Sequence, residues 1–582
     1  MRKERIVFDY RHYFLRSVVF LYYHLGENGF LILLGVVTGL VTGVGAGAMK
    51  LGAARLSEFA PYLRGHGWLL PALLLPAAGL AGAFLLGRLL LRRRPATSLS
   101  WVIYDLQEKQ PEMSWLETFS HIFTSAVTVG LGGSAGLETP SVLTGAAIGS
   151  KTGWLCRLSV DKRGTLMVCG TAAGISAVFG SPIAGALFAL EVVFPRQARR
   201  RLVPILLSSA GAAIIAELIF GSGSMFKVPS APWPFHSLPY FILLGILCAF
   251  VGVYIIQLNY HFGNRLKKAF PNRWVRLGIG CAGLAGLLWL FPILAGDGYN
   301  FVQMLFSGAD KNHLQSWNHG CNLLLLSLAA VLLKVVGTVF TLECGGDGGI
   351  FAPTMFTGAF TGFLLARLVN DFTGLELSEA NFVAAGMCGV FTSSLRAPLT
   401  GIFLIVEVTG DFMLMIPLMI VSGLSYFTAK FFEPYSVYTK VLGEKHLIEA
   451  IPLQQINRHT PVGDAIETDF SAVGAQTPLA ELRATGESAK ITYLPVIDAN
   501  RKLLGIVMPD RLAAATDPKL TAAALMMEPL LTLSPKDDAN KAQISFEIYG
   551  LDYLPVIDGG KFIGFVPKTR FEPAPAAEEA TA

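Results

Sequence analysis

The stretch GGSAGLETPSVLTGA at residues 132–146 occurs a second time as GGDGGIFAPTMFTGA at residues 345–359, 213 positions later. Seven of the fifteen positions are identical, and they include four glycines and the proline. A second match follows in the same order: AAGISAVFGSPIAGALFALEV from Ala172 resembles AAGMCGVFTSSLRAPLTGIFLIVEV from Ala384, with four extra residues in the second copy. This part of the chain therefore consists of two homologous halves.

The composition around these loops indicates a membrane protein. Of 582 residues, 53% are hydrophobic and 15% are charged, against roughly 25% charged in soluble domains, and the mean hydropathy is +0.53. The basic residues behind the net charge of +5 lie between apolar runs rather than in a patch, so nucleic acid binding is not expected. Stretches long enough to span a bilayer are Leu31 to Met49, Leu69 to Leu91, Leu238 to Leu258, Leu323 to Leu342 and Gly401 to Tyr426.

Other apolar segments are shorter or interrupted by glycine and proline, namely Ser125 to Ile148, Thr165 to Val193 and Gly349 to Leu368. Irregular backbone at membrane depth is tolerated only where it is buried or lines a cavity. Repeats of this kind often place a substrate site near the bilayer midplane, where broken helices meet. By the positive-inside rule, cytoplasmic loops are expected at Arg88 to Arg94, Arg196 to Arg201 and Arg265 to Arg276.

The chain changes character after about Glu444. Strand-like runs alternate there with short helical patterns, and Tyr-Leu-Pro-Val-Ile-Asp occurs at both 493–498 and 553–558. Two such α/β repeats cannot easily bury their faces alone, so they should pack as a pair. We therefore predict a cytoplasmic N-terminal segment at residues 1–29, a transmembrane domain at residues 30–444, a tandem α/β domain at residues 453–572 and a disordered tail at residues 573–582.

The repeated loops have the chemistry of an anion site. In each loop glycines precede a proline that opens an apolar helical run, and proline suits the first helical turn while glycines let backbone N–H groups approach a ligand. A helix N-terminus offers unpaired N–H donors and a partial positive charge, which can replace part of an anion's hydration. No basic residue lies within either loop, which favours release as well as binding.

Glu138 interrupts these neutral loops, at the position where the second copy has Phe351. A carboxylate before a helix start can occupy an anion position itself, so its protonation or movement would open or close the path. An ordinary N-terminal capping acid is the alternative role. Because ionisable groups at such depth are usually functional, we interpret Glu138 as a gate.

With these motifs the chain resembles the CLC chloride channel and transporter family over roughly residues 30–440, and its C-terminal repeats look like a CBS-domain pair. Gly136-Leu-Glu-Thr-Pro140 is similar to the family's G-K/R-E-G/A-P loop, and Gly349-Ile-Phe-Ala-Pro353 matches its G-x-F-x-P loop. The resemblance implies an all-α polytopic membrane domain of two inverted-topology repeats with broken helices, followed by a small α/β CBS pair. It also implies a homodimer with one chloride pore per subunit.

The same resemblance implies roles for individual residues. Glu138 would be the external gating glutamate, and Tyr438 in EPYSVYTK would donate its hydroxyl group to chloride. An interfacial aromatic anchor is the alternative role for this tyrosine. The implied anion-binding residues are Thr97, Ser98, Gly136, Leu137, Gly349, Ile350, Phe351, Ala352 and Tyr438.

Several positions depart from the family pattern. The family's G-S-G-I-P loop is poorly kept in Ala96-Thr-Ser-Leu-Ser-Trp101, where counting aligns Thr97 with the chloride-binding serine and leaves Ser98 one residue away. Either hydroxyl group could donate to the anion. Leu137 replaces the usual basic residue before the gating glutamate and Thr139 the small residue after it, so the field and the room around the gate should differ.

Val192 stands where proton-coupled family members carry an internal glutamate for proton relay. Valine cannot carry a proton, and the resemblance therefore favours a passive voltage- or pH-gated channel over a proton-coupled antiporter. A water wire could still substitute for the missing carboxylate. The neighbouring Glu191 has an equivalent in the second copy, Glu407, which favours a structural role for both.

The CBS-like pair departs from its pattern too. Arg511 and Arg570 stand where nucleotide-binding members carry an aspartate that holds the ribose. Binding of ATP or AMP therefore stays open, beside a purely structural and dimerising role.

Alternatives to a chloride channel are an antiporter on the same scaffold and a CBS-regulated divalent-cation transporter. The cation transporter would need clustered acids, whereas Asp347 is the one acid in the second loop. An enzyme is not predicted, because no nucleophile with a base partner and no metal-ligand cluster is evident. No cofactor is required, the partners expected are chloride and the lipid bilayer, and the predicted location is the bacterial inner membrane with the C-terminal domain in the cytoplasm.

Overall fold

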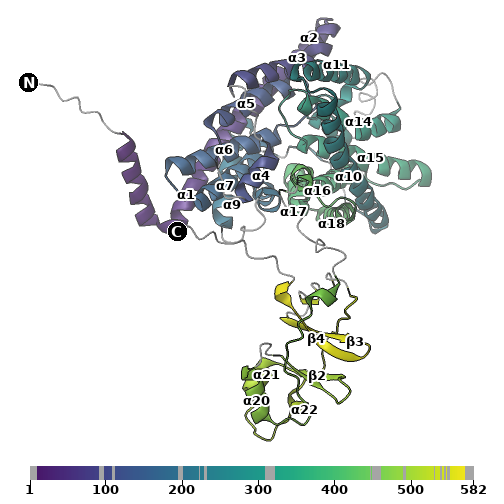
Figure 1. Cartoon of the computed structure of the whole chain (residues 1–582). Helices are drawn as coiled ribbons and strands as arrows, with labels where there is room; N and C mark the ends of the chain where they lie inside the picture. The colour runs from purple at the N-terminus through teal and green to yellow at the C-terminus, as the bar shows by residue number, and fades with distance from the viewer. Residues whose placement is uncertain are drawn as a thin grey trace, which may run out of the picture. The chain divides into compact units, whose positions relative to one another are not determined.

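The computed structural model describes residues 10–570 except 91–97, 108–111, 194–200, 222, 224, 229–231, 308–321, 446, 448–460, 489–492, 530, 538–540, 543–544 and 547–550. The chain divides into two compact units, residues 1–448 and 449–582 (Figure 1). The first unit is helical, and the second carries short strands and helices.

The first repeat of the helical unit contains α1 (Tyr10–Ser57), α2 (Phe59–Gly65), α3 (Leu69–Leu90), α4 (Leu99–Gln107), α5 (Trp115–Gly130), α6 (Glu138–Leu155), α7 (Val160–Phe179), α8 (Pro182–Phe188), the π-helix η1 (Ala189–Val193) and α9 (Leu202–Phe220). The second contains η3 (Phe235–Ser237), α10 (Leu238–Ala269), α11 (Arg273–Leu290), η4 (Pro292–Leu294), α12 (Tyr299–Ser307), α14 (Leu323–Glu343), α15 (Phe351–Thr373), α16 (Glu379–Leu395), α17 (Pro398–Thr409), α18 (Met415–Phe432) and α19 (Lys440–Glu444).

The two repeats fold alike. Helix α6 packs on α7 as α15 packs on α16, and α1 packs on α9 as α10 packs on α18. Helices α6 and α15 begin at Glu138 and Phe351, the residues that the 213-residue offset pairs. The prediction of two homologous halves is thereby confirmed at the level of single helix starts.

Glycines allow the closest helix packing in each repeat. A Cβ on Gly145 of α6 would overlap the carbonyl group of Gly170 on α7, and a Cβ on Gly358 of α15 would overlap that of Gly386 on α16. Small residues at matched positions let two membrane helices approach through their backbones. The helix that follows each repeated loop is consequently fixed against the next helix of its own repeat.

Among the described residues, seven helices are long and apolar enough to cross a membrane: Phe20–Gly65, Leu69–Leu90, Leu202–Phe220, Phe235–Ala269, Leu323–Glu343, Phe351–Thr373 and Met415–Phe432. The apolar helices Pro182–Val193 and Pro398–Thr409 are too short to span. Pro182–Val193 falls within Thr165 to Val193, one of the interrupted segments predicted from glycine and proline. The predicted span Gly401 to Tyr426 is instead divided between Pro398–Thr409 and Met415–Phe432. Gly349 to Leu368, predicted as interrupted, forms the span-length helix Phe351–Thr373. The predicted N-terminal segment is continuous with the first span, since α1 runs from Tyr10 with a kink at Gly26.

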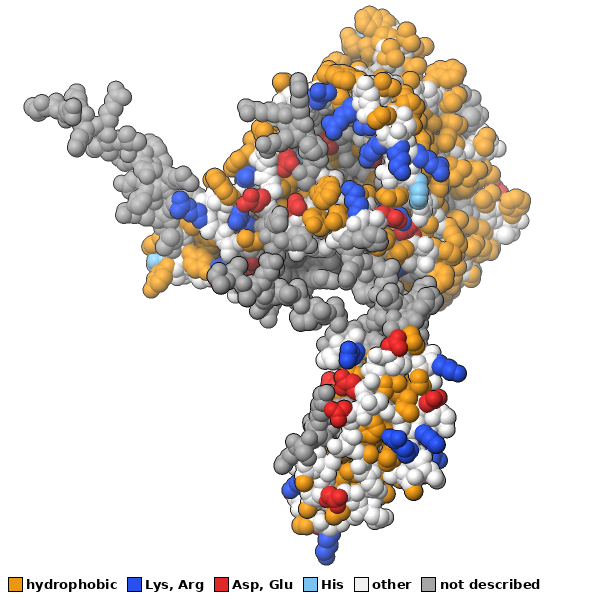
Figure 2. All heavy atoms as spheres, viewed as in Figure 1, with side chains coloured by type: hydrophobic (Ala, Val, Ile, Leu, Met, Phe, Trp, Pro, Cys, Tyr) orange, Lys and Arg blue, Asp and Glu red, His pale blue; other side chains and the backbone are white. Residues whose placement is uncertain are grey.

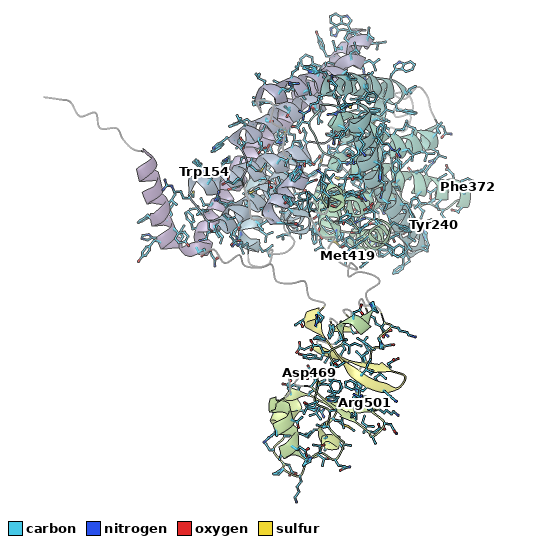
Figure 3. All side chains as sticks on the ribbon, viewed as in Figure 1. Trp154, Tyr240, Phe372, Met419, Asp469 and Arg501 are labelled. Carbon is cyan, nitrogen blue, oxygen red and sulfur yellow. The ribbon has the colours of Figure 1, made fainter. Side chains whose placement is uncertain are left out.

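Hydrophobic side chains cover much of the visible surface of the helical unit (Figure 2). Trp154, Phe372 and Met419, from α6, α15 and α18, point outward (Figure 3) and are all exposed. In water such a surface would be a large unpaired apolar patch. In a bilayer it is the lipid-facing surface of a multi-pass membrane protein.

The C-terminal unit contains two hairpins. Strand β1 (Leu494–Ile497) pairs antiparallel with β2 (Leu503–Val507), and β3 (Tyr553–Asp558) pairs antiparallel with β4 (Lys561–Pro567). Its helices are η5 (Val462–Ala465), α20 (Leu479–Ser488), α21 (Pro509–Ala514), α22 (Ala522–Leu525) and η6 (Lys568–Arg570).

The two C-terminal repeats pack against each other, as predicted. The rings of Tyr493 and Tyr553, the first residues of the duplicated motif, lie 5.3 Å apart. The backbone N–H of Phe562 in the second repeat donates to the carbonyl oxygen of Arg501 in the first, at 2.8 Å. Each repeat thus covers an apolar face of the other.

Candidate anion-binding site

The two repeated glycine loops are bonded directly to each other. The N–H of Gly136 donates to the carbonyl oxygen of Gly349 at 2.9 Å, and the N–H of Gly349 donates to that of Gly136 at 2.8 Å. These residues are equivalent under the 213-residue offset, so each contact is matched by its reciprocal. Such reciprocity is the signature of a two-fold axis between like surfaces, and it places the axis between the two loops.

This pairing corrects the expectation that Gly136 and Gly349 donate to the anion. Both N–H groups already have a backbone acceptor. The close approach explains the glycines, because a Cβ on Gly349 would overlap the side chain of Thr139 and one on Gly136 would overlap the carboxyl group of Glu138. The two glycines therefore hold the loops together, which sequence reasoning alone did not show.

The donors that can face an anion come from the residues after each glycine. Leu137 and Ile350 precede α6 and α15, and neither helix has a side-chain cap at this end. The first N–H groups of a helix have no intrahelical acceptor, and prolines occupy the third position of both helices. The N-termini of α6 and α15, neither of which is capped by the side chain of the residue before it, thus meet at the paired glycines.

The carboxyl group of Glu138 lies within this arrangement. The residue is 1% exposed, and its Oε1 accepts a hydrogen bond from the hydroxyl group of Tyr299 at 2.7 Å. The backbone amides of Glu138 itself and of Ala352 also face the carboxyl group. Its second oxygen, Oε2, has no hydrogen-bond partner within normal geometry among the described residues. The carboxylate therefore occupies space beside amides from both loops.

Phe351, the first residue of α15, lies in a cluster of aromatic rings. It is 1% exposed, and its ring lies 4.7 Å from that of Phe391, 5.3 Å from that of Phe179 and 6.0 Å from that of Phe188. These rings come from α16, α7 and α8. An aromatic cluster of this kind excludes water and strengthens the interactions of the nearby amide dipoles.

Tyr438 lies near the first loop. Its hydroxyl group is 3.2 Å from Oγ1 of Thr139, and the tyrosine is 7% exposed. The N–H of Val437 donates to the carbonyl oxygen of Ser394 at 2.9 Å, which ties this segment to α16. The structure therefore brings Tyr438 beside the residue that follows Glu138, and the hydroxyl group can turn from Thr139 to an anion.

Of the two hydroxyl residues predicted as anion ligands, Thr97 lies outside the described residues. Ser98 directly precedes α4, its carbonyl oxygen accepts from the N–H groups of Trp101 and Val102, and its side chain is exposed. Its role as an anion ligand stays a prediction.

Val192 is buried in η1. Its neighbour Glu191 has a carboxylate, but that group caps a helix. The carboxylate of Glu191 accepts hydrogen bonds from the N–H groups of Leu399 and Thr400, at 3.0 and 2.8 Å, at the start of α17. Glu407 in α17 does the same at the start of α8, where Ile183 and Ala184 donate at 3.0 and 2.8 Å. Each repeat thus caps the short helix of the other, which supports the structural role predicted for both glutamates.

We expect Glu191→Ala and Glu407→Ala to lower stability by similar amounts, about 1–2 kcal/mol each, because each removes one charged helix cap. Anion transport should keep its wild-type pH dependence, since the two carboxylates bond to the starts of α8 and α17. Thermal unfolding in detergent and chloride efflux from liposomes check the two parts. A loss of pH dependence in Glu191→Ala alone would contradict the structural role.

Sequence reasoning missed the polar residues around Glu138. Tyr299 and Asp297 lie in a segment with no counterpart in the repeated motifs, so no pattern singled them out. Lys334 is the one charged residue between Leu323 and Leu342, a span-length apolar run, and it is fully buried. A charge inside such a run is a usable signal of function.

A family model described as voltage gated chloride channel matches residues 82–430, and a CBS domain model matches residues 522–571, the second C-terminal repeat. The H(+)/Cl(-) exchange transporter ClcA of Salmonella agona is 30% identical over 376 residues, covering 62% of this chain and 75% of that protein. The ClcA of Vibrio cholerae is 29% identical over 343 residues, covering 57% and 70%.

Solved structures give the same picture. A CLC-type fluoride/proton antiporter is similar with a TM-score of 0.59 and 27% identity, covering 70% of this chain and 96% of that one. A slow cyanobacterial Cl-/H+ antiporter reaches a TM-score of 0.62 at 24% identity, covering 72% and 98%. A eukaryotic CLC transporter reaches 0.59 at 18% identity over 93% and 97%. At their lower identities the last two bear on the fold alone.

Proposed function

Because the chain belongs to the voltage-gated chloride channel (CLC) family and transports anions in a membrane, we propose that it exchanges chloride or a similar small anion for protons. Glu138 is the group that binds the proton and closes the anion path. The location of its carboxyl group carries the proposal: it is buried beside amides from both glycine loops and held by one hydroxyl group. A group placed there competes with an anion when charged and yields when protonated.

The relatives support exchange over the passive channel that Val192 favoured. Two curated relatives are named H(+)/Cl(-) exchange transporters, and the 27% identical structure is a fluoride/proton antiporter. The divalent-cation alternative has no support from these matches. A passive channel remains the second candidate on one specific observation, which is that residue 192 has no carboxylate and Glu191 is committed to helix α17.

Purified protein in liposomes distinguishes the two candidates. With a chloride gradient across sealed vesicles and an internal pH dye, an exchanger drives protons against their own gradient. Dissipation of chloride with no proton movement would refute exchange and favour the channel. A parallel run with a fluoride gradient tells which anion is preferred.

We also propose that the protein is a homodimer of the cell (inner) membrane, with one pathway per subunit and the CBS-like pair in the cytoplasm. The resemblance of the chain to CLC proteins supports the assembly, and the basic loops support the orientation. Arg511 and Arg570 are exposed in the C-terminal unit. Nucleotide binding stays a prediction, which titration of the full-length protein with ATP tests.

A further inference from the structure

Among the described residues, Tyr299 is the one other side chain that donates a hydrogen bond of normal geometry to the carboxyl oxygens of Glu138. We propose that Tyr299 is a positioning residue, a latch whose hydroxyl group holds the Glu138 carboxylate in the closed position and sets the pH at which the anion path opens. The inference rests on the proposed gating role of Glu138 and deepens it.

The latch is held on the ring side by apolar neighbours. Tyr299 is 7% exposed, and its ring makes edge contacts with Phe179 at 6.1 Å and Phe226 at 5.8 Å. Its hydroxyl group also lies 3.9 Å from the sulfur of Met355 on α15. These contacts hold the ring in place, and of the two acceptors near its hydroxyl group Oε1 of Glu138 is by far the closer, at 2.7 Å.

Two charged residues, Asp297 and Lys334, fix the backbone around Tyr299, and we call this pair the bracket. Oδ1 of Asp297 accepts from the N–H of Tyr299 at 3.1 Å. Lys334 on α14 donates from Nζ to the carbonyl oxygens of Leu294 at 3.0 Å and Gly296 at 2.8 Å. Its ammonium group also lies 4.7 Å from the centre of the Phe356 ring.

The bracket is joined to the first glycine loop. The N–H of Gly296 donates to the carbonyl oxygen of Gly132 at 3.3 Å. The segment that carries Tyr299 is therefore bonded both to a buried lysine of the second repeat and to the loop that carries the gate. Movement of the loop and of the latch is coupled through this contact.

Comparison of the two repeats shows that the arrangement around Tyr299 occurs at the first loop and not at the second. Lys334 lies 17 residues before Phe351, and its counterpart His121 lies 17 residues before Glu138. Nδ1 of His121 lies 2.9 Å from Oδ2 of Asp347 in the second loop, whereas Lys334 donates to the backbone of Leu294 and Gly296 in its own repeat. The segment held by Lys334 directs the hydroxyl group of Tyr299 at the carboxylate of Glu138. The second loop has Phe351 at the matched position, which carries no carboxylate to accept such a bond.

Four titratable groups face Glu138 from the elements around it. They are Tyr299 on α12, Asp297 before it, Lys50 on α1 and Tyr438. Lys50 donates from Nζ to the carbonyl oxygen of Val178 at 2.8 Å, and Tyr438 pairs with Thr139. Tyr299 differs from the others because it donates directly to the carboxylate and stabilises the charged, closed form.

The test is chloride efflux from liposomes as a function of pH for wild type, Tyr299→Phe and Tyr254→Phe. Tyr254 is the matched control, since its hydroxyl group donates to the carbonyl oxygen of Leu332 at 2.6 Å, away from the gate. Loss of the latch destabilises the charged closed form, so protonation opens the gate more readily. We expect the half-maximal pH of Tyr299→Phe to rise by about one unit and that of Tyr254→Phe to stay at the wild-type value.

Glu138→Gln and the double variant with Tyr299→Phe complete the experiment. We expect the double variant to match Glu138→Gln, because the latch acts only through the carboxylate. An unshifted Tyr299→Phe beside a pH-insensitive Glu138→Gln overturns the latch alone, whereas wild-type pH dependence in Glu138→Gln overturns the gate and the latch together. If Tyr299→Phe fails to fold, a fluorinated tyrosine at position 299 replaces it. Its stronger donor should move the half-maximal pH down, and no movement overturns the latch.

Discussion

Glu138→Gln should raise chloride efflux at pH 7.5 about tenfold and remove most of its pH dependence. Glutamine keeps the size of the side chain but carries no negative charge, so it mimics the protonated gate. The charge-assisted hydrogen bond from Tyr299 is weakened, and such bonds contribute about 1.5–3 kcal/mol. The measurement is efflux from liposomes between pH 5 and 8, with uphill proton movement recorded in the same vesicles.

Proton movement should disappear in this variant, because its carboxamide cannot bind and release a proton at these pH values. Glu191→Gln is a control with the same chemical change at a carboxylate that caps α17, and it should keep both the pH dependence and the proton movement. Retention of coupled proton transport by Glu138→Gln would contradict the assigned role.

Gly145→Val should prevent the helical unit from folding. A Cβ at this position would overlap the backbone carbonyl of Gly170, which cannot move without separating α6 from α7. Overpacking of this kind against backbone costs more than about 3 kcal/mol. It would also displace the start of α6, where Glu138 lies. Size-exclusion chromatography and thermal unfolding in detergent measure the effect.

Gly278→Val is the matched control. Gly278 lies on the exposed side of α11, and a Cβ added there would have no other atom within 4 Å. The same substitution should therefore leave a monodisperse, stable protein. Equal stability of the two variants would contradict the close packing of α6 and α7.

Much of this arrangement could be predicted from the duplicated loop. Identical glycines and prolines at a fixed offset predicted two homologous halves, and the helix starts at Glu138 and Phe351 follow that offset. The interrupted segment Thr165 to Val193 predicted a helix too short to span, and α8 is of this kind. The break between α17 and α18 was not predicted, because Gly401 to Tyr426 is one nearly continuous apolar run in the sequence. The reason is that glycine, proline and the spacing of apolar residues determine where a helix begins and ends through local effects, which the sequence shows directly.

The remaining features depend on contacts between distant segments. Nothing in the sequence showed that Gly136 and Gly349 would pair with each other rather than with an anion, since a glycine is compatible with both. Tyr299 reaches Glu138 across 161 residues from a segment outside the repeat. The missing carboxylate at Val192 led to a passive channel as the main interpretation. That inference was weak, because one missing carboxylate says nothing about other proton routes.

In the proposed mechanism the Glu138 carboxylate and the transported anion compete for the same amides between the two loops. Calorimetric titration of the purified protein with chloride, for wild type and Glu138→Gln at pH 5 and 8, tests this most directly. We predict that wild type binds chloride about tenfold more weakly at pH 8 than at pH 5, the effect of one charge-assisted hydrogen bond, and that Glu138→Gln binds it tightly at both. The same chloride affinity in all four titrations would contradict this competition.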